Sequence, residues 1–153
     1  MRIKLRRCNE NDIDIVYKLS NDSSIRCNSF NKNPISYEEH YKWYNNSLNN
    51  SNRIMYLIML NELIIGQIRL DKKYYTGEIS FSLDSCYRGK GYGKEALKLI
   101  ENEALKNEIL VLEGNVLKDN ISSRNVFTKN GFVEIDENEY FRYVYLLNND
   151  KKN

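Results

Sequence analysis

Proline is almost absent from this sequence, which has a single one, Pro34, among 153 residues. No proline-rich linker, internal repeat or long block of one charge divides the chain. We therefore expect one domain over residues 1–147, followed by a short polar tail at 148–153. A chain of this length can bury a hydrophobic core without disulfides or a structural metal.

Long apolar runs are also missing. The most apolar stretch, residues 54–70, contains four polar or charged side chains and cannot cross a bilayer. The basic N-terminal segment is not followed by an apolar stretch, so we expect no signal peptide. Cys8, Cys27 and Cys86 are odd in number and widely spaced, as is usual in a reducing compartment. These features predict a cytoplasmic protein with no membrane partner.

Net charge is small as well. The chain has 23 Lys and Arg against 21 Asp and Glu, a formal charge of +2 at pH 7. Such a charge creates too weak an overall field to attract nucleic acid. A nucleic-acid-binding sheet would also interleave aromatic and basic side chains, and the strands expected at 77–83 and 109–116 do not. We therefore predict no nucleic-acid partner, and any cationic function must come from local clusters.

What the sequence does contain is a regular succession of strand-like and helix-like segments. Alternation of apolar and polar residues, and runs rich in residues that favour strands, predict strands at 2–7, 53–60, 63–70, 77–83, 109–116, 132–135 and 140–147. Amphipathic spacing and capping residues predict helices at 9–22, 36–48, 93–108 and 120–130. This order predicts an α/β (α+β) fold in which a mixed, mostly antiparallel sheet of about seven strands carries helices on both faces.

Glycine is scarce except in one loop. Three of the seven glycines fall at alternate positions in residues 89–93, among three cations, where a strand passes into a helix. Such a loop can turn its backbone N–H groups towards an anion, and the helix start adds partial positive charge. A Walker motif would need Ser or Thr where Glu95 stands, and a dinucleotide fingerprint needs a different glycine spacing. The structural alternative is a glycine-rich turn with solvated basic neighbours.

Two motifs resemble one known family. The run RGKGYG at 88–93 resembles the Q/R-x-x-G-x-G/A signature of the GNAT superfamily of acyl-coenzyme-A-dependent N-acyltransferases. The segment VLKDNISSRNVFTKNGF at 116–132 resembles the family's later N-x-x-S/A and Y-x-x-x-G-F landmark, and the order of elements over 2–147 is similar too. The resemblance implies the GNAT fold, with a splayed V between two central parallel strands. It also implies acetyl-CoA as co-substrate, with no metal.

The resemblance further implies a set of coenzyme contacts. Backbone N–H groups from Gly89 to Lys94 would hold the pyrophosphate, and the strand end at 81–83 would lie beside the pantetheine arm. The Leu83 N–H would be the oxyanion donor to the thioester carbonyl, and Asn120 would hydrogen-bond the arm. The implied coenzyme-binding residues are Phe81, Ser82, Leu83, Arg88, Gly89, Lys90, Gly91, Tyr92, Gly93, Lys94, Asn120, Ser123 and Phe127.

One position departs from the family pattern. Many members have a tyrosine seven residues after the asparagine, and its phenol protonates the departing thiolate. Phe127 stands there and has no proton to give. Another hydroxyl, with Tyr140 and Tyr143 as candidates, or water could supply the proton, or a thiolate could leave without a dedicated acid.

The base that would deprotonate the attacking amine also stays open. Glu78 begins the coenzyme strand, where several family members place a carboxylate, and the alternative is an ordinary polar strand end. His40, the single histidine, is either an acceptor-site residue or a packing residue on its helix. A nucleophilic pair of Cys86 with His40 is conceivable, but the direct transfer typical of the family makes it unnecessary.

The acceptor is read from the first half of the chain. Residues 24–46 and 64–83 resemble a GNAT branch of nucleotide-sugar pathways, which includes enzymes that acetylate an amino group on a nucleotide-linked deoxy-sugar. Arg26 and Arg69 would bind a diphosphate, aromatic rings would stack, and polar side chains would bind hydroxyls. The aromatic residues could equally be core residues at helical spacing. The predicted acceptor residues are Arg26, Phe30, His40, Trp43, Gln67 and Arg69, with Tyr44 as a further stacking candidate.

We therefore predict an N-acetyltransferase that moves an acetyl group from acetyl-CoA to a primary amine, and a homodimer is possible. Other acceptors within the same chemistry are a protein N-terminus or lysine, an aminoglycoside and a polyamine. A different class, a coenzyme-A-binding sensor without transferase activity, is kept open by Phe127.

Overall fold

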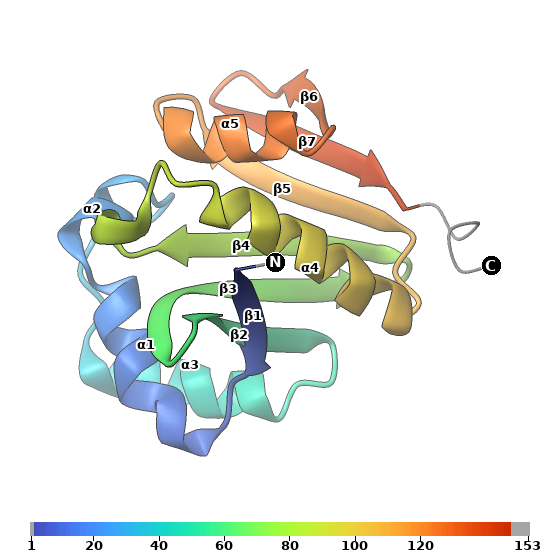
Figure 1. Cartoon of the computed structure of the whole chain (residues 1–153). Helices are drawn as coiled ribbons and strands as arrows, with labels where there is room; N and C mark the ends of the chain where they lie inside the picture. Colours follow the sequence, from blue (N-terminus) through green and yellow to red (C-terminus); the bar gives the residue numbers. More distant parts are fainter. Residues whose placement is uncertain (1, 148–153) are drawn as a thin grey trace.

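The computed structural model (Figure 1) describes residues 2–147, and the predicted tail at 148–153 lies outside them. The strands are β1 (Ile3–Arg7), β2 (Arg53–Leu60), β3 (Leu63–Lys73), β4 (Thr76–Leu83), β5 (Val111–Leu117), β6 (Val133–Asp136) and β7 (Tyr140–Leu146). The helices are α1 (Ile13–Ser20), α2 (Ser23–Cys27), α3 (Tyr37–Leu48), α4 (Tyr92–Lys106) and α5 (Ile121–Lys129). Two 3-10 turns, η1 (Glu10–Asp12) and η2 (Ser85–Tyr87), complete the described elements.

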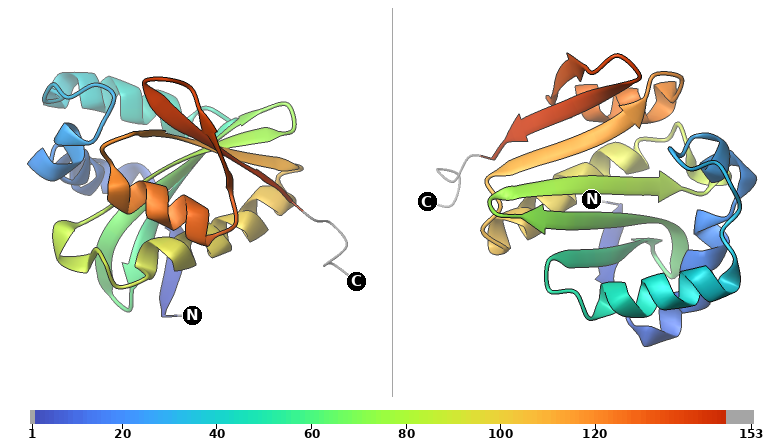
Figure 2. Two further views of the ribbon diagram at one scale, coloured as in Figure 1. Left: turned by 90° about the horizontal axis from the view of Figure 1, so that it is seen from above. Right: turned by 180° about the vertical axis from the view of Figure 1, so that it is seen from behind.

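The described strands form one seven-stranded sheet in the order β1-β2-β3-β4-β5-β7-β6. Among the strands of residues 2–147, only β4 and β5 pair in parallel, and every other neighbouring pair is antiparallel. Figure 2 shows α4 and α5 on one face of the sheet and α1 and α3 on the other. The predicted mixed sheet with helices on both faces is confirmed.

The central parallel pair is short. β4 pairs with β5 only over Thr76–Glu78 and Val111–Glu113, after which the two strands diverge. Figure 1 shows the gap widening towards the end of β4. The predicted V between the two central parallel strands is therefore present. It leaves one edge of β4 without a strand partner from residue 79 to residue 83.

Strand β2 is buried on both faces and separates two hydrophobic clusters. Ile54, Tyr56 and Ile58 face α4 and belong to the main core, together with much of β3, β4 and β5. Met55 and Leu57 point the other way, into a smaller cluster under α1 and α3. Because successive side chains of a strand alternate between faces, this one apolar run supports both helical layers.

The region between β1 and α3 differs most from the sequence prediction. The helix expected at 9–22 is the 3-10 turn η1 followed by α1. A further short helix, α2, follows it and was not predicted. Asp22 begins α2 because its side chain accepts a hydrogen bond from the Ser24 N–H.

Candidate active site

The glycine loop before α4 has the backbone geometry of an anion site. Gly89 and Gly91 have φ angles of +73° and +87°, which side chains other than glycine rarely adopt. The first hydrogen bond of α4 runs from the Glu95 N–H to the Gly91 carbonyl, at 3.2 Å. The N–H groups of residues 92–94 therefore have no acceptor within the helix. Together with the partial positive charge at the helix start, they favour an anion.

Gly93 has a packing role, although the sequence pattern had grouped it with the two loop glycines. It is the second residue of α4, and an added Cβ would lie 3.1 Å from Val126 Cγ2 and 3.6 Å from Phe81 Cε2. The missing side chain therefore lets the start of α4 approach both α5 and β4.

Arg2, the residue before β1, holds this loop in place, and sequence reasoning missed it. Its backbone N–H and its Nε each donate to the Glu95 carboxylate at 2.8 Å, and its Nη2 donates to the Lys90 carbonyl at 2.9 Å. Its guanidinium also lies 4.5 Å from the centre of the Tyr92 ring. Burial would raise the pKa of Glu95, but the hydrogen bonds from Arg2 outweigh it and lower the pKa. No local pattern could reveal a contact that spans 93 residues.

A cavity of about 550 Å³, which we call the coenzyme cavity after the expectation from the sequence, opens beside the loop, between α4, α5 and the end of β4. The predicted coenzyme residues that line it are Phe81, Ser82, Leu83, Arg88, Gly89, Gly91, Tyr92, Gly93, Lys94, Asn120 and Ser123; Lys90 and Phe127 do not. Sequence reasoning missed the polar residues that α2 and its C-terminal end contribute, and Lys129 on α5. Among the described residues, the lining of this cavity contains no Asp or Glu.

The free edge of β4 faces this cavity. The Asp84 N–H donates to the Ile65 carbonyl at 2.8 Å, and Leu83 lies opposite Gly66. Hydrogen-bonded and non-bonded pairs alternate in an antiparallel ladder, so the N–H and carbonyl of Leu83 point away from β3, towards the V. The Arg88 Nε donates to that Leu83 carbonyl at 3.0 Å, while the Arg88 Nη2 donates to Ser24 Oγ at 2.8 Å. Arg88 therefore joins the strand end to α2.

Phe127 is a core residue rather than a coenzyme-cavity residue. Its ring is 2% exposed and stacks on Tyr143, with ring centres 5.1 Å apart and an interplanar angle of 9°. A Cβ added at Gly114 would lie only 2.3 Å from Phe127 Cζ, so the ring rests directly on the backbone of β5. The edge of Phe127 also reaches a smaller cavity, described below, at the mouth of the V.

The two tyrosines suggested as acids lie in different places. Tyr143 is fully buried, and its hydroxyl donates to Glu134 at 2.6 Å. Burial, and next the hydrogen bond to Glu134, raise its pKa to about 12. Tyr143 lines neither the coenzyme cavity nor the smaller cavity at the mouth of the V. Tyr140 contacts the exposed ring of Phe30, at 5.7 Å between ring centres.

A second cavity of about 490 Å³ lies on the opposite face of the sheet, enclosed by α1, α2, α3, β3 and β4. We call it the acceptor cavity. Of the predicted acceptor residues it is lined by Arg26, His40, Trp43, Gln67 and Arg69. Phe30 lines instead a cavity of about 320 Å³ at the mouth of the V. Tyr44 is a core residue, 0% exposed, whose hydroxyl donates to the Asn9 carbonyl at 2.6 Å.

Several acceptor-cavity side chains are already held by neighbours. His40 is 2% exposed, and its Nε2 donates to the Ile13 carbonyl at 2.8 Å. Its ring packs among aromatic rings of α1 and α3. The Gln67 Nε2 donates to Ser20 Oγ at 3.0 Å. The structure does not pair His40 with Cys86, which is exposed in η2.

Arg26 and Arg69 lie where the acceptor cavity meets the cavity at the mouth of the V. Arg69 contacts Asp71 at 3.1 Å, but Asp71 is shared with Arg53 at 2.6 Å. One carboxylate therefore faces two guanidinium groups. Arg26 donates to the Asn33 carbonyl at 3.1 Å, and its buried Nε has no hydrogen-bond partner. The charge balance in this region is positive.

Glu78 does not line any of these cavities in residues 2–147. It accepts a hydrogen bond from Asn115 Nδ2 at 3.3 Å, at the closed end of the V, where β4 and β5 make their last pair. The Asn115 Oδ1 is buried and has no partner. Asn115 therefore separates the carboxylate of Glu78 from the cavity that the reacting groups would use.

Comparison with known proteins identifies the family. Residues 2–133 match the model of the acetyltransferase (GNAT) domain, so the chain belongs to this family of acyl-CoA-dependent N-acetyltransferases. The predicted enzyme class is thereby confirmed. A comparison with curated protein sequences finds no match for this chain.

Solved structures share the fold at low sequence identity. Spermidine N-acetyltransferase from Vibrio cholerae, in complex with CoA and spermine, has a TM-score of 0.85 at 17% identity, with 95% of this chain and 96% of that chain covered. A Methanocaldococcus jannaschii domain has a TM-score of 0.85 at 21% identity, covering 95% and 98%. An aminoglycoside acetyltransferase in complex with coenzyme A has a TM-score of 0.80 at 17% identity, covering 94% of each chain.

The residues present fit the donor that the family uses, acetyl-CoA. A loop with two positive φ angles, helix N–H groups without intrahelical acceptors, a free strand edge and a cavity without carboxylates suit a pyrophosphate and an amide-bearing arm. No group of three or more His, Cys, Asp or Glu in residues 2–147 is placed to hold a metal. Over the same residues, no helix is both long enough and apolar enough to cross a membrane.

Proposed function

We propose that this protein transfers an acetyl group from acetyl-CoA directly to a primary amine held in the acceptor cavity. The observation that carries the proposal is the contact between the two cavities. Ser29 and Phe81 line the coenzyme cavity, the acceptor cavity and the mouth of the V alike. A thioester beside the end of β4 would thus face an amine arriving from the other side of the sheet.

The transfer forms a C–N bond and breaks the C–S bond of the thioester. In our proposal the Leu83 N–H stabilises the developing oxyanion. The departing thiolate is a fair leaving group, so the proton it takes up can come from water, since Phe127 offers none. Glu78 remains our proposed base; because Asn115 lies between its carboxylate and the cavity, a chain of water molecules would carry the proton from the amine to it.

For the acceptor we propose an amino sugar on a nucleotide. Arg26 and Arg69 support it, because together they offer positive charge for a diphosphate. The acceptor cavity has a single carboxylate in its described lining, Glu39, whereas a polycation such as spermidine would favour several. Trp43 offers a ring, though Arg53 and Arg69 already lie 5.5 and 5.4 Å from its centre.

The test is thiol release from acetyl-CoA against a panel of amines: nucleotide-linked amino sugars, aminoglycosides, polyamines and peptide N-termini. Gly91→Trp serves as the loop-blocked control. We expect turnover on a sugar nucleotide, lost in the control. Turnover on polyamines or peptides alone would overturn the proposed acceptor while leaving the transferase.

A second candidate is a coenzyme-A-binding sensor, and the buried Phe127 in place of a phenol favours it. Tight coenzyme binding without turnover on any amine would support this candidate. The cytoplasmic location, the single domain over residues 1–147 and the possible homodimer remain predictions of the sequence.

A further inference from the structure

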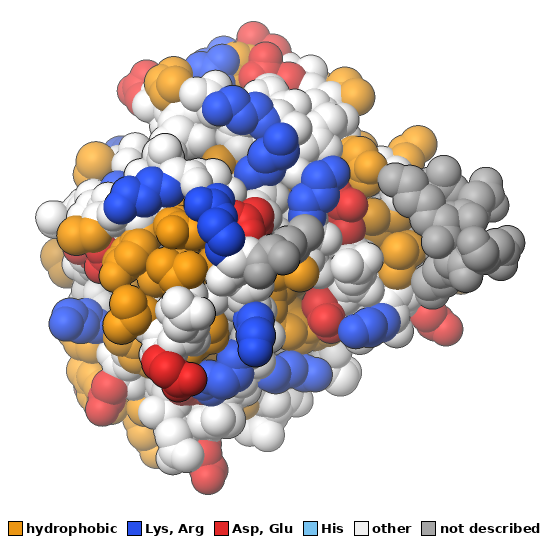
Figure 3. Space-filling model, in the orientation of Figure 1, with side chains coloured by type: hydrophobic (Ala, Val, Ile, Leu, Met, Phe, Trp, Pro, Cys, Tyr) orange, Lys and Arg blue, Asp and Glu red, His pale blue; other side chains and the backbone are white. Residues whose placement is uncertain are grey.

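The coenzyme cavity contains more positive charge than the pyrophosphate loop needs. Three cations line it, Arg88, Lys94 and Lys129, and its described lining has no carboxylate to balance them. Figure 3 shows Lys and Arg side chains gathered over the loop before α4 and over the neighbouring part of α5. Arg88 already donates hydrogen bonds to the Leu83 carbonyl and to Ser24, so its guanidinium joins the strand end to α2.

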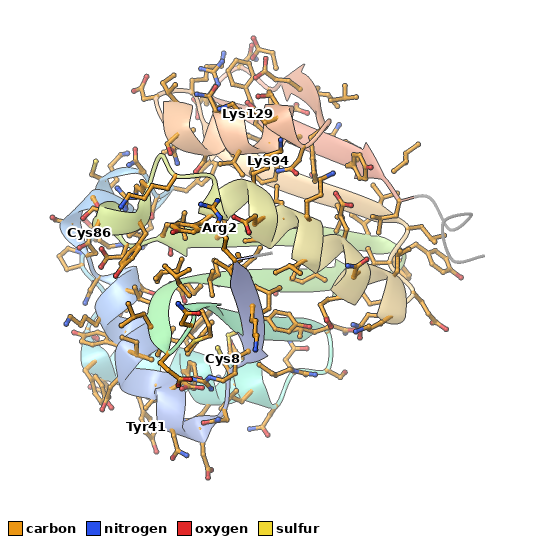
Figure 4. The ribbon with its side chains drawn as sticks, viewed as in Figure 1. Arg2, Cys8, Tyr41, Cys86, Lys94 and Lys129 are labelled. Atoms are coloured by element: carbon orange, nitrogen blue, oxygen red, sulfur yellow. The ribbon has the colours of Figure 1, made fainter. Side chains whose placement is uncertain are left out.

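Lys94 and Lys129 are different, because both side chains are exposed. Within residues 2–147, neither makes an ion pair with a carboxylate. They come from opposite walls of the cavity, Lys94 from the first turn of α4 and Lys129 from the last turn of α5. Figure 4 shows the two residues on the same side of the molecule, on adjacent helices. Two free ammonium groups across one cavity would bind a doubly charged anion.

Coenzyme A has a pyrophosphate and a 3′-phosphate, and we expect different groups of the cavity to bind each of them. The pyrophosphate can use the backbone N–H groups of the loop. The 3′-phosphate is a monoester with a charge near −2 at neutral pH, and it needs cations of its own. Asn120, beside the V, and Lys129 are nine residues apart, about 13 Å along the axis of α5. With the pantetheine arm in the V beside Asn120, the adenosine end would lie towards Lys129.

We propose that Lys94 and Lys129 bind the 3′-phosphate of coenzyme A and make the protein prefer CoA to 3′-dephospho-CoA. This inference rests on coenzyme binding in the cavity and does not depend on the acceptor. A purely structural role for Lys129 would be stabilisation of the C-terminal end of α5. Lys106 occupies the same place on α4 and does not line the coenzyme cavity, so it is the matched control for that role.

The test is equilibrium binding of CoA and of 3′-dephospho-CoA, measured by titration calorimetry. The wild-type protein should bind CoA at least about tenfold more tightly than 3′-dephospho-CoA, because each hydrogen bond to a charged group adds appreciably to the free energy of binding. The double variant Lys94→Ala, Lys129→Ala should lose most of that preference while its affinity for 3′-dephospho-CoA stays within about twofold. Added salt should reduce the preference in the wild type.

Two further controls separate the site from a general field effect. Lys98→Ala, one turn after Lys94 on the same helix, and Lys106→Ala should leave the preference unchanged. Equal affinity of the wild type for both ligands would overturn the proposal, as would a double variant that weakens both ligands equally. Failure of the wild type to bind either ligand would instead overturn the coenzyme cavity itself. An amine panel without turnover would affect only the proposed function.

Discussion

The two cavities of this protein are built in different ways. The coenzyme cavity relies on backbone: positive φ angles at Gly89 and Gly91, the first N–H groups of α4, and the free edge of β4. The acceptor cavity relies on side chains that already hydrogen-bond to neighbours, as His40 and Gln67 do. A backbone site fixes one ligand shared by a whole family, whereas a side-chain site can change its ligand by substitution. This difference predicts that a substitution in one cavity changes ligand binding there and leaves the other cavity unaffected.

The largest expected effect is at Gly91. Gly91→Trp places a side chain at φ +87°, where an added Cβ would already be 3.1 Å from Arg2 Nη2. Strain and lost phosphate contacts together should weaken coenzyme binding by about 100-fold or more, measured by calorimetry. Gly131→Ala is the matched control, because Gly131 also has a positive φ, +83°, but lies after α5. It should cost about 1 kcal/mol of stability and leave coenzyme affinity unchanged. Similar binding losses in both variants would contradict a backbone-defined site.

A large effect on stability alone is expected at Phe127. Phe127→Ala should lower the free energy of unfolding by about 3–5 kcal/mol, because it empties the space over Gly114 and beside Tyr143. Urea unfolding followed by circular dichroism measures this. Phe30→Ala should change stability by less than about 0.5 kcal/mol, since Phe30 is 58% exposed. A mild Phe127→Ala variant with selectively lost turnover would show that Phe127 serves the reaction instead.

A moderate effect is expected at Arg2, which would act as a positioning residue. Arg2→Ala removes the donors to Glu95 and to the Lys90 carbonyl, so coenzyme affinity should fall about tenfold. Arg2→Lys should recover part of it, and Arg7→Ala, at the other end of β1, should have no effect. Because the pKa of Glu95 is lowered in the folded protein, the stabilisation is present above its ordinary pKa and is lost as the pH falls through the folded value. Affinity that does not depend on Arg2 would show that the loop is rigid without the brace.

The smallest expected effect concerns Cys8, at the wall of the acceptor cavity. Burial raises the pKa of its thiol to about 11, so at pH 8 it should resist iodoacetamide while the exposed Cys27 and Cys86 react. Mass spectrometry counts the labels, and unfolded protein is the control in which every cysteine reacts. The raised pKa implies stabilisation that is present below pH 9 and lost as the pH rises towards 11. Rapid labelling of Cys8 would show that the small cluster under α1 and α3 opens readily.

Features set by neighbouring residues could be predicted from the sequence, whereas contacts between remote residues could not. The strands and α4 were predicted because alternation and helical spacing are local signals. The glycine loop was predicted because positive φ angles require glycine locally. Arg2 was missed because it contacts the glycine loop from a segment remote in sequence, and Lys129 because it lies outside the motif, at the far end of α5. Phe127 was predicted from its motif position to bind the coenzyme, and only the tertiary structure showed that its ring packs against Gly114 in the core and reaches the mouth of the V with its edge.

The sequence by itself determined the order of elements, the mixed sheet and the loop for an anion, because backbone conformation and periodicity are set by neighbouring residues. Tertiary structure decided which side chains meet. It turned the early polar segment into α2, gave Arg69 and Arg53 one shared carboxylate, and set Lys129 across a cavity from Lys94. Such contacts depend on the way β4 and β5 separate and on the helices that pack on either face, which no short stretch of sequence encodes.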